Sequence, residues 1–210
     1  MTKWSPGKRG HVSLIVDTRI PLEEPTVLSA SLESQAPPFT PWFHLEWSPE
    51  MELNLTVGCC ENPDNPIAKS NINAFTPELW RHDVGELFIR HSASEVYLEI
   101  NLAPYGAWWA CLFSSYRNPI TEATEAPFTP VALGAETSKN GWETSLKVPQ
   151  DFLQEALAFD ASSKANVCFI LGGPSQRHHF SYADLPHDPP DYHHVADFVA
   201  MKWPKWVTVS

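Results

Sequence analysis

The sequence predicts an all-β protein in which two antiparallel sheets pack as a sandwich, with one short helix near residues 149–157. Short segments of alternating apolar and polar residues recur along the 210-residue chain, as expected for strands with one buried face. The 20 prolines and 9 glycines separate these segments and disfavour long helices. Many short strands with proline- and glycine-rich turns are typical of a β-sandwich.

The predicted elements follow one another from the N-terminus with turn residues between them. The clearest alternation places Phe43, Leu45 and Trp47 on one face of a strand. The dipeptide Asn140-Gly141 favours a tight hairpin between two strands, and helical spacing appears only after Pro149. We expect three strands within residues 78–117 and further strands at residues 11–17, 27–32, 42–47, 51–57, 131–135, 142–148, 166–171, 180–183 and 196–203.

The charge balance excludes two classes of partner. The chain has 14 basic and 25 acidic residues, which gives a net charge of -11. Nucleic acids and anionic membranes are both bound through lysine and arginine, so neither is expected as a partner. No segment has the roughly 20 apolar residues of a membrane span, and the N-terminus lacks the apolar core of a signal peptide. A cytoplasmic location is therefore expected.

The stretch 78–117 contains the candidate ligand-binding surface. Its central strand alternates between a core face of aliphatic residues and an open face with Tyr97, Glu99 and Asn101. Trp80 lies before this strand and the adjacent Trp108 and Trp109 lie after it, so only one of that pair can share the open face. A sugar could be bound by aromatic rings together with the carboxyl, amide and guanidinium groups of neighbouring side chains.

Glu86 has two alternative interpretations. It shares a strand face with Val84 and Phe88, and a buried carboxylate costs several kcal/mol unless it is hydrogen-bonded or paired. It could form a buried ion pair with an arginine and so maintain the strand register, the candidates being Arg81, Arg90 and Arg117. Alternatively, it could be a polar anchor at the base of a ligand groove.

A second candidate site is the histidine- and aspartate-rich segment 178–194. Imidazole and carboxylate groups are ligands of zinc and manganese, so this segment could hold a metal, although its spacing matches no standard metal motif. It could equally form a hydrogen-bonded loop or contribute to the ligand pocket. The metal-ligand candidates are His179, His187, Asp191, His193 and His194. Because the chain lacks a phosphate-binding loop, a G-x-S-x-G motif and a Cys–His nucleophile, no catalytic residue is predicted.

Several motifs resemble those of the DOMON-like bacterial proteins, which are related to the family 9 carbohydrate-binding modules. They are L-W-R-H-D-V-G-E-L-F-I-R at 79–90, Y-L-E-I-N-L-A-P-Y-G-A-W-W-A at 97–110, F-S-S-Y-R at 113–117 and S-Y-A-D-L-P-H-D-P-P-D-Y-H-H at 181–194. The resemblance implies that residues 1–210 form one two-sheet domain that binds a sugar between aromatic side chains. Some relatives bind haem, for which His82 or a histidine of the 178–194 segment would be the axial ligand. Ala183 stands where the family pattern usually has tryptophan, and no calcium-site residues are recognisable.

These observations predict a non-catalytic protein that binds a carbohydrate or a similar small polar ligand and requires no cofactor. The alternatives are a metal-dependent hydrolase that uses segment 178–194 and a haem-binding protein. The predicted ligand-binding residues are Trp80, Glu86, Tyr97, Glu99, Asn101, Trp109, Tyr116 and Arg117.

Overall fold

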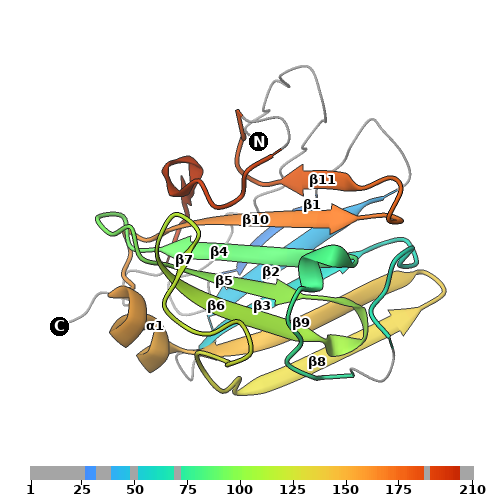
Figure 1. The fold of residues 1–210 in the computed structure, drawn as a ribbon, viewed down its shortest axis with the longest axis horizontal. Coiled ribbons are helices and arrows are strands. Elements are labelled where there is room, and N and C mark those ends of the chain that lie inside the picture. The colour runs from blue at the N-terminus through green and yellow to red at the C-terminus, as the bar shows by residue number, and fades with distance from the viewer. Residues whose placement is uncertain (1–26, 32–38, 48–51, 69–71, 187–189, 204–210) are drawn as a thin grey trace.

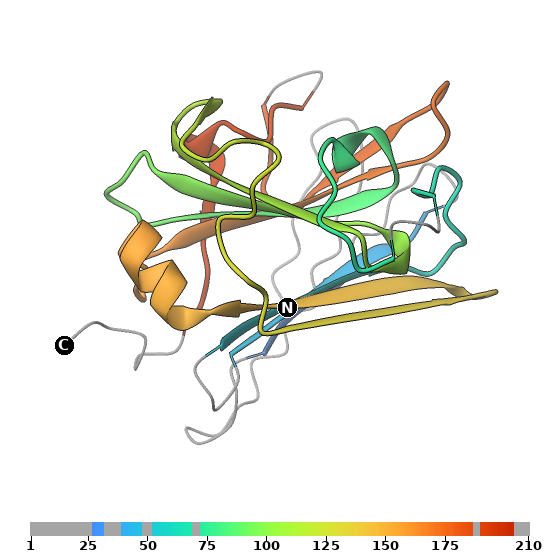
Figure 2. The same cartoon turned by 60° about the horizontal axis from the view of Figure 1, so that its bottom comes forward.

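Two antiparallel sheets face each other across a hydrophobic core, as the sequence predicts (Figure 1). The computed structural model describes residues 27–31, 39–47, 52–68, 72–186 and 190–203. Figure 2 shows the sheets as two layers with their strands running across the molecule. The strand predicted at residues 11–17 lies outside the described residues.

The first sheet has the strand order β1-β2-β3-β9-β8. In β2 the side chains of Phe43, Leu45 and Trp47 are buried and alternate with half-buried residues, which confirms the predicted inward face. The predicted Asn140-Gly141 hairpin is confirmed between β8 and β9. The strands are β1 Val27–Ser31, β2 Pro41–Trp47, β3 Glu52–Cys59, β8 Ala132–Ser138 and β9 Gly141–Pro149.

The second sheet has the order β11-β10-β4-β5-β6-β7, and β12 also pairs with β10. The prediction of a strand over 196–203 is wrong for most of its length. A 3-10 turn, η4 (Val195–Asp197), occupies its start, where the side chains of His194 and Asp197 bond to each other. The strands are β4 Val84–Arg90, β5 Tyr97–Leu102, β6 Trp108–Ser115, β7 Asn118–Pro119, β10 Lys164–Leu171, β11 His178–Ser181 and β12 Val199–Ala200.

The predicted helix is confirmed as α1 (Gln150–Leu157), which begins directly after Pro149. It buries Leu153 and Leu157 and ends at Ala158, which adopts a left-handed conformation. Two 3-10 turns, η2 (Leu79–Arg81) and η3 (Pro104–Gly106), lie in the connections beside β4 and β6. None of the described helices is long and apolar enough to cross a membrane.

Both faces of the second sheet are buried. Its inner face contributes Leu98, Ile100 and Leu102 to the core between the sheets, as predicted from the alternation. Its outer face forms a second apolar cluster, to which residues of the connecting loops such as Ile67 and Tyr192 contribute. The predicted open face around Tyr97, Glu99 and Asn101 is therefore wrong, because loops far away in the sequence cover it.

Candidate functional site

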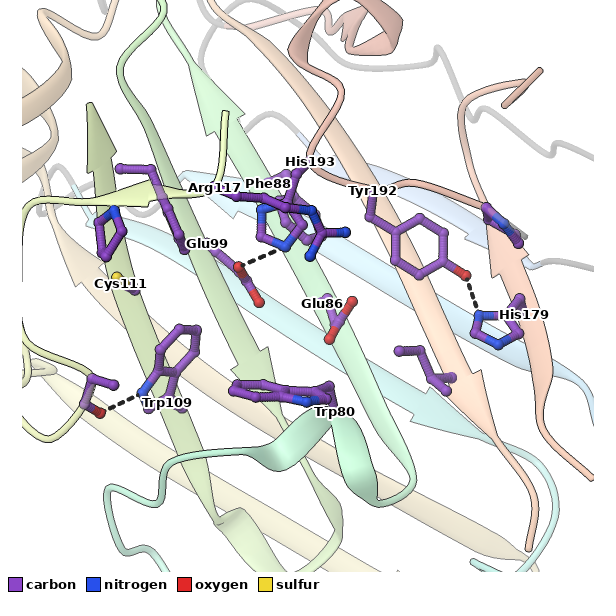
Figure 3. A pocket seen from close by; sticks show the side chains of 15 residues that line it. Trp80, Glu86, Phe88, Glu99, Trp109, Cys111, Arg117, His179, Tyr192 and His193 are labelled. Carbon is purple, nitrogen blue, oxygen red and sulfur yellow. Dashed lines mark hydrogen bonds and ion pairs between the residues drawn. The ribbon is translucent and has the colours of Figure 1, made fainter. Parts of the chain in front are cut away.

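A cavity of about 460 Å³ lies over the outer face of the second sheet (Figure 3). Strands β4, β5 and β6 form its floor, and the loops that cross this face form its walls. Its size falls within the range of roughly 300–1,000 Å³ that is usual for small-molecule sites. The lining residues are Trp80, Glu86, Phe88, Glu99, Trp109, Cys111, Phe113, Arg117, Pro119, Ala123, Ile170, His179, Pro190, Tyr192 and His193.

Strand register brings two carboxyl groups to the floor. Glu86 on β4 pairs with Asn101 on β5, and Phe88 pairs with Glu99. Glu86 and Glu99 are consequently diagonal neighbours on the same face, a position that puts their Cα atoms roughly 7–8 Å apart. The period-2 alternation of each strand dictates this arrangement once the register is set.

Two tryptophans form one wall of the cavity. Trp80 projects from η2 and its ring meets that of Trp109 at a centroid distance of 5.6 Å and an interplanar angle of 72°. The Nε1–H of Trp109 donates a hydrogen bond to the carbonyl oxygen of Ala123 at 2.8 Å, which fixes the orientation of its ring. Trp108 lies on the opposite face, in the core between the sheets, so the prediction that the pair divides between faces is confirmed.

Asp191 connects the C-terminal loop to the turn after β6. Its carboxylate accepts hydrogen bonds from the hydroxyl of Tyr116 at 2.7 Å and from Nη2 of Arg117 at 3.2 Å. It also accepts a bond from the backbone N–H of His193. These contacts hold the loop against the sheet, where it forms the roof of the cavity.

His193 is half-buried between the roof and the floor. A hydrogen bond of 2.7 Å joins its Nδ1 to the hydroxyl of Tyr97, which also accepts the backbone N–H of Arg117. Its Nε2 lies 3.7 Å from Oε2 of Glu99, as Figure 3 shows. On the floor, the amide of Asn101 donates to Oε1 of Glu99 at 2.9 Å. Glu99 is thus oriented from two sides.

The predicted ligand residues fall into two groups. The side chains of Trp80, Glu86, Glu99, Trp109 and Arg117 line the cavity. The other three predicted residues lie behind them: Tyr97 and Asn101 are fully buried, and Tyr116 is exposed outside the lining. Tyr97 and Asn101 position the cavity residues His193 and Glu99 through the bonds described above, and Tyr116 bonds to Asp191 in the roof loop. Contact of these three residues with a ligand stays a prediction.

Glu86 has no arginine partner of the kind that would maintain the strand register, so that interpretation is wrong. Among the described residues, no hydrogen bond or ion pair reaches its carboxyl group, which is 2% exposed and faces the cavity (Figure 3). The three candidate arginines are engaged elsewhere. Arg90 donates to backbone carbonyl groups, Arg81 pairs with Glu78, and Arg117 pairs with Asp191.

Burial shifts the proton affinity of the central groups. Burial raises the pKa of Glu99 to about 7, although hydrogen bonding by Asn101 and the charge of Arg117 oppose the change. Burial, followed by the nearby Glu99 charge, raises the pKa of Glu86 well above its usual value. Burial also lowers the pKa of His193 to about 4, with Arg117 contributing. Both carboxyl groups therefore bind a proton more tightly than exposed carboxyl groups do, and near neutral pH His193 is uncharged.

The described metal-ligand candidates do not converge. No group of three histidine, cysteine or acidic side chains suited to a metal ion occurs in the described part of the chain, and His187 lies outside it. His179 bonds to Tyr192, and Asp191 and His193 make the contacts given above. His194 is partnered by Asp197. Two of the interpretations considered for segment 178–194 describe these residues: hydrogen-bonded packing of the loop, and a contribution to the pocket.

The residues present do not form the predicted haem site around His82. His82 is not among the residues that line the cavity, and its Nδ1 is buried without a hydrogen-bond partner in the described structure. The two histidines that line the cavity, His179 and His193, each bond through Nδ1 to a tyrosine. Between them lie the two buried carboxyl groups.

Sequence reasoning missed several lining residues. Cys111 and Phe113 follow Trp109 at intervals of two on β6, so the alternation contains a signal for them. Phe88 shares the face of Glu86 in the same way. Tyr192 is different because its loop position provides no periodic signal, and only the folded chain places it over the sheet.

Comparisons with known proteins support the fold. No protein-family model matches the chain. The zebrafish (Danio rerio) "UPF0462 protein C4orf33 homolog" is 24% identical over 128 residues. That alignment covers 58% of this chain, which spans only 60% of the zebrafish protein's length. A crystal structure of a candidate carbohydrate-binding protein from Bacteroides uniformis ATCC 8492 superposes with a TM-score of 0.57 and 17% identity, covering 76% of each chain. The structural likeness agrees with the two-sheet sandwich.

Proposed function

We propose that this chain is a non-catalytic binding protein whose cavity holds a carbohydrate or a similar small polar ligand. The observation that carries the proposal is the buried, unpartnered carboxyl group of Glu86 in a cavity walled by Trp80 and Trp109. A sugar offers hydroxyl donors to such a carboxyl group and apolar C–H faces to aromatic rings. Small-molecule sites commonly combine an apolar lining with a few polar groups in this way.

Two similarities support the proposal. The motifs at 79–90 and 97–110 resemble those of DOMON-like proteins and family 9 carbohydrate-binding modules, and they contain most of the cavity floor. The Bacteroides protein with a similar fold is itself named as a candidate for carbohydrate binding. We propose on this basis that residues 1–210 form one domain of the DOMON-like type.

Isothermal calorimetry and tryptophan fluorescence against xylo-, gluco- and manno-oligosaccharides test the proposal. We expect saturable binding, accompanied by a change in fluorescence because Trp80 and Trp109 line the cavity. Trp80 is 40% exposed, so Trp80→Ala should remove ring contacts with little effect on folding and weaken binding about tenfold, equivalent to about 1.4 kcal/mol.

Val131→Ala is the control, because Val131 is an exposed apolar residue that does not line the cavity. Its affinity for the same ligand should equal that of the unmodified protein. The absence of binding across all three oligosaccharide series would contradict the proposed function.

A further inference from the structure

The cavity has more negative than positive groups. Among the described residues, Arg117 is the one arginine in its lining, and Nη2 of Arg117 is already 3.2 Å from Oδ1 of Asp191. Arg177 lies close enough to affect Glu86, but it also interacts with the buried Asp83, and its guanidinium donates to backbone carbonyl groups around 170–172. Glu86 and Glu99 are therefore left without a full countercharge.

Glu86 is the cavity residue whose carboxyl group would gain most from a hydrogen bond with a ligand. It is buried, it points into the cavity, and within the described structure no donor reaches it (Figure 3). A buried carboxyl group in this situation loses its hydration without a compensating hydrogen bond. A donor on a bound ligand would replace that hydration, and a positively charged donor would do so most strongly.

Aromatic side chains surround the two carboxyl groups. The negative face of an aromatic ring attracts a cation, and cages of such rings recognise organic ammonium groups. The rings come from η2, from strands β4 and β6 of the second sheet and from the roof loop, and they belong to Trp80, Phe88, Trp109, Phe113 and Tyr192. An anionic ligand would instead be disfavoured beside two acidic groups, because the guanidinium of Arg117 is already paired with Asp191.

We propose that this cavity recognises a ligand bearing a cationic amine, with the carboxyl groups of Glu86 and Glu99 as its counterions and the aromatic rings as its apolar contacts. The inference rests on the proposed function in one respect: if the ligand is a sugar, it is an amino sugar. An ammonium group can donate to the carboxyl group of Glu86, while the C–H faces of a sugar ring contact Trp80 and Trp109.

The same charges make binding depend on pH. A cation favours the ionised carboxylates, so its binding should release protons that the carboxyl groups of Glu86 and Glu99 hold when the cavity is free. His193 does not compensate, because its low pKa keeps it neutral. Among the described residues, the titratable or charged groups facing this pair from the packed elements are Tyr97, Cys111, Arg117, Cys168, Arg177, His179, Tyr192 and His193.

Calorimetry with matched ligands tests the inference. At pH 6.5 the disaccharide of glucosamine should bind at least tenfold more tightly than either its N-acetylated form or cellobiose. Tetramethylammonium, which cannot lose a proton, should bind with an affinity that increases from pH 6 to pH 8. Its binding heat should vary with the ionisation enthalpy of the buffer, since protons are released by the protein.

Glu86→Gln is the decisive variant, with Glu136→Gln as the matched control on exposed β8. The first should lose the tenfold preference for the amine, so that the glucosamine disaccharide and cellobiose bind with similar affinity. The second should behave as the unmodified protein. An unchanged preference in Glu86→Gln would overturn the assignment of the amine to this cavity.

The remaining outcomes separate the inference from the proposed function. Equal affinity for glucosamine disaccharide and cellobiose would overturn the inference and leave sugar binding intact. Binding of tetramethylammonium without binding of any sugar would support the inference and contradict the proposed function. Failure of every probe to bind would overturn both.

Discussion

Glu99 and His193 are neighbouring residues whose pKa values change in opposite directions. Burial raises the pKa of Glu99 to about 7, so between about pH 4.5 and pH 7 the folded state retains a proton that the unfolded chain has lost. The free energy of unfolding consequently falls as the pH rises through this window. Burial lowers the pKa of His193 to about 4, so its contribution rises between about pH 4 and pH 6.5. The two effects partly cancel.

Glu99→Gln should separate these effects. The free energy of unfolding of the variant, relative to that of the unmodified protein, should increase between pH 4.5 and pH 7 by up to about 3 kcal/mol, at about 1.4 kcal/mol per pKa unit. Denaturant unfolding at a series of pH values measures the difference. A difference that stays constant with pH for Glu99→Gln would contradict the prediction.

The hairpin between β8 and β9 depends on one glycine. Gly141 has a φ of 125°, which L side chains rarely adopt, and a Cβ atom there would lie 2.1 Å from the carbonyl oxygen of Cys59. The clash is with backbone, so a rotamer change cannot relieve it. The close approach of this turn to the backbone of β3 therefore explains why the Asn140-Gly141 hairpin needs glycine at position 141.

Gly141→Ala should therefore destabilise the protein by about 2 kcal/mol or more. Thermal and denaturant unfolding measure the change. Gly173→Ala provides the control, because nothing lies within 4 Å of its added Cβ, and its effect should stay within about 0.5 kcal/mol. Equal stability of the two variants would show that the hairpin tolerates a side chain at Gly141.

At the scale of the whole molecule, Gly85 sets how closely the sheets approach. It lies on β4, the strand that also provides Glu86, and a Cβ atom added to it would be 2.7 Å from Cβ of Val57 on β3. It would also be 2.9 Å from Cε1 of Phe169. An alanine at this position would push the two sheets apart and displace the cavity floor.

We expect Gly85→Ala to cost about 1–3 kcal/mol through overpacking. Combining it with Val57→Ala, which removes the opposing methyl groups, should recover part of that loss. A double-mutant cycle of unfolding free energies measures the coupling, which should favour the double variant by at least about 0.5 kcal/mol. If the unfolding free energies of the two substitutions are additive, the strain does not arise at the contact between residues 85 and 57.

Local patterns in the sequence are sufficient for much of the fold. Alternation identifies β2, β3 and β5, assigns Leu98 and Ile100 to the core, and places Trp108 and Trp109 on opposite faces. It also brings Glu86, Glu99 and Trp109 to a common face. These features follow from the period of two in a strand, which depends only on neighbouring residues.

The cavity itself is decided by the tertiary structure. Arg90 donates to the carbonyl oxygen of Val195, 105 residues away, and Asp191 bonds to Tyr116 across 75 residues. Such contacts turn the open face expected from alternation into an enclosed one, because they fold the C-terminal loop over the sheet. The sequence by itself determined the face on which the carboxyl groups lie. Only the tertiary structure decided that they are buried, since desolvation depends on what packs above them.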